Sequence, residues 1–142
     1  MTRRSAILAS VWVLGLVALA ATATIVYAKK SKPLPGPGIG VSMMPDKTFD
    51  PQTVTAVPGQ RVTWTNKDTV THSVIPDTGH VKGGPDSHIK HRRGIKPGQS
   101  YHWNVPDNAT SGTTYYYHDK DYGKPGDGMT LGSGMAGSVT VR

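Results

Sequence analysis

The sequence predicts an all-β domain, and three observations support this fold class. After residue 30 the chain is rich in Gly, Pro, Thr and Val and poor in Leu, Ala and Glu, a composition that favours strands and turns over helices. Apolar and polar residues alternate in stretches such as Val62-Thr63-Trp64-Thr65, as they do in a strand with one buried face. Pro58-Gly59 and Pro97-Gly98 mark turns between such stretches.

These patterns divide the domain into short strands and two long loops. The expected strands are Ile39–Met43, Gln52–Val57, Arg61–Asn66, His72–Ile75, Ser100–Val105, Thr114–His118 and Gly137–Val141. The loops cover residues 76–99, which carry three histidines, and residues 119–134, which are rich in glycine. Loops of this length in a compact domain are usually functional or disordered.

The first 38 residues predict export rather than folded structure. Arg3 and Arg4 precede residues 6–28, an uncharged apolar run that suits either a cleaved signal or a membrane-anchor helix. Residues 29–38 form a Pro/Gly-rich linker. The expected organisation is therefore a signal or anchor at 1–28, a linker at 29–38 and one domain at 39–142. The domain would lie on the outer face of the membrane, or in the periplasm or outside the cell if the signal is cleaved.

The formal net charge of +7 narrows the choice of partners. The densest basic cluster in the domain is Lys90, Arg92, Arg93 and Lys96, which fits an acidic partner protein or simply a solvated loop. Aromatic residues do not interleave with Lys and Arg as in nucleic-acid binding proteins, so nucleic acid is excluded as a partner. The sequence contains no nucleophile-elbow serine, P-loop or zinc-protease motif, and it therefore predicts no particular enzyme activity.

Four segments in order carry a family resemblance. They are FDPQTVTAVPGQRVTWTNKD at 49–68, THSV at 71–74, PGQSY at 97–101, and GTTYYYH with GMAGSVTV between residues 112 and 141. Together they resemble the cupredoxins, the plastocyanin-like blue-copper proteins, over nearly all of residues 39–142. The resemblance implies a Greek-key β-sandwich that binds copper at one end through two imidazoles, a thiolate and an axial methionine.

The chain departs from this family at the position of the thiolate. It contains no cysteine. The resemblance places the first histidine ligand at His72, and counting from Gly112 places the family's cysteine at His118. The second histidine falls at Asp121, and the methionine falls at Met135, with Met129 as a rival.

This donor set predicts a copper site without the blue thiolate band. Two imidazoles with a methionine would favour Cu(I), whereas two imidazoles with a carboxylate would favour Cu(II) or Zn(II). The leading hypothesis is an exported copper protein in copper handling or one-electron transfer. The alternatives are a metal-free interaction module, with both histidines as ordinary polar residues, and a type 2 copper enzyme with an open coordination position.

The remaining histidines leave two interpretations open. His80, His88 and His91 lie in the 76–99 loop, where they could form a second metal site or be solvent-exposed. His102 is expected on the surface of a strand. Trp64, Trp103 and Tyr116 are expected in the core, and the Tyr116 face of its strand would then bring His118 beside His72.

Overall fold

The computed structural model describes residues 36–142, with the exception of residues 78, 80 and 90. The apolar run at 6–28 and most of the linker lie outside the described residues, so export and anchoring stay predictions. None of the described residues belongs to a helix long and apolar enough to cross a bilayer.

The described residues form two four-stranded sheets. One sheet has the order β2-β1-β4-β6, and the other has the order β3-β8-β7-β5. The strands are β1 (Ile39–Met43), β2 (Phe49–Asp50), β3 (Thr53–Ala56), β4 (Arg61–Asn66), β5 (Ile75–Pro76), β6 (Ser100–Asn104), β7 (Thr114–Lys124) and β8 (Ser133–Val141). A 3-10 turn, η1 (Ser87–Ile89), interrupts the segment between β5 and β6.

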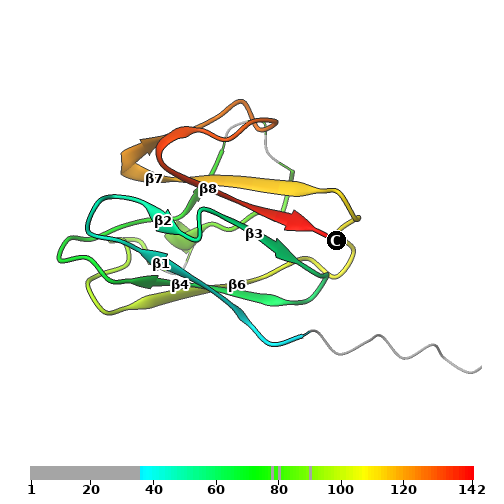
Figure 1. The fold of residues 1–142 in the computed structure, drawn as a ribbon, viewed down its shortest axis with the longest axis horizontal. Helices are drawn as coiled ribbons and strands as arrows, with labels where there is room; N and C mark the ends of the chain where they lie inside the picture. Colours follow the sequence, from blue (N-terminus) through cyan, green and yellow to red (C-terminus); the bar gives the residue numbers. More distant parts are fainter. Residues whose placement is uncertain (1–35, 78, 80, 90) are drawn as a thin grey trace, which may run out of the picture. The chain divides into compact units, whose positions relative to one another are not determined.

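Figure 1 shows the two layers, with β7 and β8 in one and β1, β4 and β6 in the other. Strands β1 and β4 pair in parallel, as do β3 and β8, while β7 pairs antiparallel with both β8 and β5. The chain crosses repeatedly between the sheets, and the predicted all-β sandwich is confirmed.

The core lies between the sheets and is aromatic. Trp64 of β4 is fully buried, and its ring meets the ring of Tyr117 from β7 edge-on at 5.2 Å. Phe49 also packs edge-on against Tyr117, with the ring centroids 5.0 Å apart. The expectation that Tyr116 belongs to the core is wrong, because Tyr115 and Tyr117 are the buried members of the alternating pattern in β7.

Most expected strands appear where the sequence placed them. The bounds of β1 and β4 are those predicted. The expected strand at 72–75 differs, because only Ile75–Pro76 joins a sheet, and His72 instead forms an isolated bridge with Ile95. This bridge ties the His72 segment, residues 71–74, to the end of the long loop before β6.

The region predicted as a long loop at 119–134 is largely a β-hairpin. Strand β7 continues to Lys124 and β8 begins at Ser133, with a register shift between His118 and Gly123. A bulge of this kind inserts residues without ending the strand pair. Glycine at position 123 permits it, because a Cβ there would collide with the backbone oxygen of Met135 and approach the backbone of Asp119.

We therefore expect Gly123→Ala to destabilise the domain by about 2 kcal/mol, since backbone atoms must move to admit the new methyl group. Gly40→Ala is the matched control, because a Cβ at Gly40 in β1 has no neighbour within 4 Å. Urea unfolding followed by tryptophan fluorescence measures both changes. Equal unfolding midpoints for the two variants would contradict the tight packing of the bulge.

Candidate metal centre

The inner face of β7 carries an aspartate next to the core aromatics. Tyr115, Tyr117 and Asp119 alternate with exposed or half-buried residues, and Asp119 is only 1% exposed. His118 lies on the opposite face of the strand. The residue that β7 directs toward the His72 segment is therefore Asp119, which the sequence analysis did not single out.

His72 is buried between two carboxylates. Its Nδ1 lies 3.3 Å from Oδ2 of Asp119, and its Nε2 lies 2.9 Å from Oδ2 of Asp68. The backbone holds the residue in place, because His72 and Ile95 exchange hydrogen bonds in both directions at 3.1 and 2.7 Å. The ring is thus fixed in position and orientation by groups from three segments.

The Asp119 carboxylate accepts several hydrogen bonds in addition to its contact with His72. Its Oδ2 accepts from the backbone N–H of Ser73 at 2.6 Å and from the Ser73 hydroxyl at 3.3 Å. Its Oδ1 accepts from the backbone N–H groups of Asp121 and Tyr122 at 2.8 and 2.9 Å. These last two bonds shape the bulge, so the same carboxylate orders the hairpin and faces the histidine.

The second carboxylate, Asp68, is paired with a lysine from the turn between β1 and β2. The Lys47 ammonium donates to Asp68 Oδ2. Lys47 and then His72 hold the pKa of Asp68 far below its usual range. Lys47 has a left-handed backbone with φ of 63°, which costs a non-glycine residue energy. The ion pair with Asp68 helps offset that strain.

An aromatic ring covers this group from the bulge. The ring of Tyr122 lies 5.3 Å from the His72 ring, and the Lys47 ammonium lies 5.1 Å from the Tyr122 ring. Tyr122 is 39% exposed and the His72 side chain is fully buried, so the tyrosine is the surface-facing member of this ring pair.

The structure places His118 in a separate pair on the outer face of its sheet. Its Nδ1 lies 2.7 Å from Oδ1 of the buried Asp77, whose Oδ2 accepts from the backbone N–H of Gly126. The expected face of β7 is wrong, for the reason seen in the core, and His72 and His118 therefore lie in different networks. This pair ties β5 to the hairpin tip.

The other predicted ligands are also dispersed. Met135 of β8 is fully buried in the hydrophobic core, whereas Met129 is 80% exposed near the hairpin tip. Asp121 is exposed on the bulge. No group of three or more His or Asp side chains in the described part of the chain has the spacing of a metal site.

Two of the loop histidines face other neighbours. The ring of His91 packs edge-on against Tyr101 at 6.2 Å. His88 is half-buried and lines a hollow of about 220 Å³ beside His72. His102 is exposed on β6, as expected, with its Nδ1 3.0 Å from the Thr63 hydroxyl.

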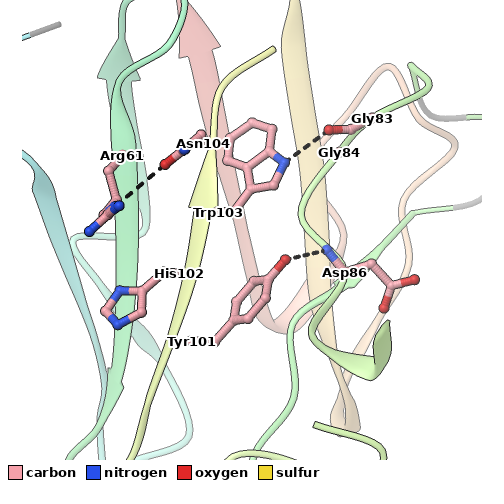
Figure 2. A pocket seen from close by; sticks show the side chains of 8 residues that line it. All are labelled: Arg61, Gly83, Gly84, Asp86, Tyr101, His102, Trp103 and Asn104. Atoms are coloured by element: carbon pink, nitrogen blue, oxygen red, sulfur yellow. Dashed lines mark hydrogen bonds between the residues drawn. The ribbon is translucent and has the colours of Figure 1, made fainter. Parts of the chain in front are cut away.

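A second hollow lies along β6, and Figure 2 shows its lining. Trp103 donates from Nε1 to the carbonyl of Gly83 at 2.9 Å, and the hydroxyl of Tyr101 accepts from the backbone N–H of Asp86 at 3.0 Å. These bonds fasten the 81–86 segment to the strand. The hollow contains none of the predicted metal ligands.

Comparison with solved structures identifies the architecture. An oxidised mutant of amicyanin is 22% identical over 74% of this chain and 82% of its own, with a TM-score of 0.50. A purple cupredoxin from Nitrosopumilus maritimus is 18% identical over 73% of this chain and 99% of its own, also with a TM-score of 0.50. The chain has the cupredoxin fold. No protein-family model and no curated protein sequence matches it.

Within this cupredoxin fold, the spacing of the hydrogen-bonded pair His72 and Asp119 can be compared with that of two ligands of one metal ion. Two ligands about 2.0 Å from an ion in tetrahedral geometry lie ~3.3 Å apart, which matches the distance between His72 Nδ1 and Asp119 Oδ2. An imidazole nitrogen and a carboxylate oxygen suit Cu(II) or Zn(II) better than Cu(I). The missing thiolate excludes a blue-copper centre.

We expect Asp119→Ala to cost about 3 kcal/mol or more of the free energy of unfolding, because backbone N–H groups of Ser73, Asp121 and Tyr122 lose their acceptor. Asp119→Asn should cost less, since its amide oxygen can still accept. Asp121→Ala removes an exposed carboxylate two residues away and should change stability by less than about 0.5 kcal/mol. Urea unfolding tests all three, and similar losses at positions 119 and 121 would refute the structural role of Asp119.

Proposed function

We propose that this chain is an exported copper-binding protein with a cysteine-free, non-blue centre. The observation that carries the proposal is the buried pair of His72 Nδ1 and Asp119 Oδ2, 3.3 Å apart and fixed by backbone hydrogen bonds. The resemblance to the blue-copper proteins implies copper, and the cupredoxin fold agrees with that implication. In this proposal His72 keeps its predicted role, and Asp119 provides the donor from β7.

The proposed donors favour copper handling over rapid electron transfer. Fast one-electron transfer in blue-copper sites depends on a thiolate ligand that this chain lacks. A site of imidazole and carboxylate holds Cu(II) and stabilises Cu(I) poorly. The proposed ligands therefore suit capture and release of the oxidised ion better than electron transfer. As a membrane anchor, residues 6–28 would hold the domain at the outer face of the membrane.

A metal-free interaction module is the second candidate, and one observation favours it. Both nitrogens of His72 face carboxylate oxygens, and those carboxylates also bind Lys47 and backbone N–H groups. The network is thus satisfied by the protein alone. In that case the histidine would serve only to stabilise this end of the sandwich.

Copper titration of the full-length chain in a non-ionic detergent separates the two candidates. We expect Cu(II) to give a type 2 electron paramagnetic resonance spectrum with hyperfine splitting from a single imidazole nitrogen and no intense visible band. His72→Asn and Asp119→Asn should each weaken Cu(II) binding by at least about tenfold, because the first removes the imidazole and the second replaces a charged carboxylate with a neutral amide. Circular dichroism of each variant confirms that it is folded.

His118→Ala is the matched control, because it removes an imidazole on the opposite face of β7. It should leave Cu(II) affinity and the nitrogen splitting unchanged. Splitting from two imidazoles that is reduced by His118→Ala would instead support the site predicted from the sequence. Absence of Cu(II) binding by the folded parent chain would support the interaction module.

A further inference from the structure

A cationic hollow borders the proposed copper site. Its volume is about 220 Å³, and it lies between the His72 segment, the 91–94 turn and the bulge of β7. Arg92, Arg93 and Lys120 line it together with one carboxylate, that of Asp121. All four side chains belong to exposed residues, so the hollow presents net positive charge to solvent beside a buried histidine.

The backbone that carries these cations is held by specific hydrogen bonds. The N–H of Gly94 donates to the carbonyl of His91 and closes the turn that carries both arginines. Gly94 has a left-handed φ of 79°, and a Cβ there would clash with Thr71. On the other side, the N–H of Lys120 donates to the Ser73 hydroxyl at 2.8 Å.

The loop leading to the arginines is anchored as well. Figure 2 shows Trp103 and Tyr101 of β6 bonded to the backbone of Gly83 and Asp86, upstream of η1. The N–H of Ser87 then donates to the carbonyl of Val74, next to the His72 segment. The arginines and Lys120 therefore extend from backbone that hydrogen bonds already hold in place. This lowers the entropic cost of binding a ligand there.

We propose that this hollow is the docking site for an acidic segment of a protein partner, with a partner carboxylate placed between the arginine pair and Lys120. Guanidinium groups bind carboxylates through paired hydrogen bonds, and two adjacent arginines supply two such forks. The charge of the lining is complementary to Asp- or Glu-rich sequence and opposes a basic partner. The docking itself does not depend on copper.

An acidic chain fits this surface better than a single small anion. Exposed charge pairs contribute little individually, so a lone carboxylate would bind weakly at solvated side chains. A segment with several carboxylates can engage the cations of both walls at once, and the linked contacts reinforce each other. The purpose of docking rests on the proposed function: the partner would give copper to, or take it from, the His72 and Asp119 pair.

Fluorescence anisotropy with a labelled peptide of alternating Glu and Gly tests the proposal on the full-length chain in a non-ionic detergent. The double substitution Arg92→Gln and Arg93→Gln should weaken peptide binding about tenfold. The matched control, Lys67→Gln with Lys96→Gln, removes the same charge from exposed residues outside the hollow and should weaken it by no more than about twofold.

Three results would overturn the proposal: no peptide binding by the parent chain, equal losses in the arginine and lysine variants, or binding of free citrate as tight as that of the peptide. The last result would assign the hollow to a small carboxylate. Cu(II) titration of the arginine variant keeps the two proposals separate. Retained copper binding with lost peptide binding supports docking, whereas peptide binding without any copper binding leaves docking intact and refutes the copper site.

Discussion

A single buried carboxylate organises the end of the sandwich that faces His72. Asp119 accepts hydrogen bonds from the backbone of Ser73 on one side and from Asp121 and Tyr122 on the other. A buried carboxylate is costly unless it is fully hydrogen-bonded, so these donors are a condition of its burial. In return they hold the bulge in one shape and fasten the His72 segment to β7. The hairpin to Lys124, the cover provided by Tyr122 and the position of Lys120 all follow from that arrangement.

The charges around His72 form a chain that links distant parts of the sequence. Lys47 comes from the turn after β1, Asp68 from the loop after β4, His72 from the bridge to Ile95, and Asp119 from β7. Each carboxylate meets a cation or an N–H donor, which is how a protein tolerates charge in a poorly solvated place. The left-handed backbone of Lys47 fits this interpretation, because strained residues persist where surrounding contacts determine them. The pair of Asp77 and His118 makes a similar connection on the outer face, where it joins β5 to the hairpin tip.

The fold could be predicted from the sequence because strands and turns are local patterns. The alternation in Arg61–Asn66 and the turn at Pro97-Gly98 each set a boundary without long-range information. The site was harder, because three consecutive tyrosines at 115–117 make both faces of β7 look equally suited to the core. Counting from Gly112 placed His118 at the position of the family's cysteine. In the structure, the residue of β7 that points inward there is Asp119 instead. Extending the alternation by one residue past His118 would have made Asp119 a candidate.

The proposed ligands, His72 and Asp119, also indicate how copper could reach and leave such a site. Imidazole and carboxylate ligands would hold Cu(II) more firmly than Cu(I), which would suit transfer of the oxidised ion better than a redox cycle in place. The described structure gives the proposed site a hydrogen-bonded frame and, on its rim, the cations Arg92, Arg93 and Lys120. A positive rim repels a free cupric ion but attracts an acidic protein that carries one. Direct transfer between proteins therefore fits this surface better than scavenging of hydrated copper, since the partner's carboxylates would neutralise the rim while the ion reaches the histidine.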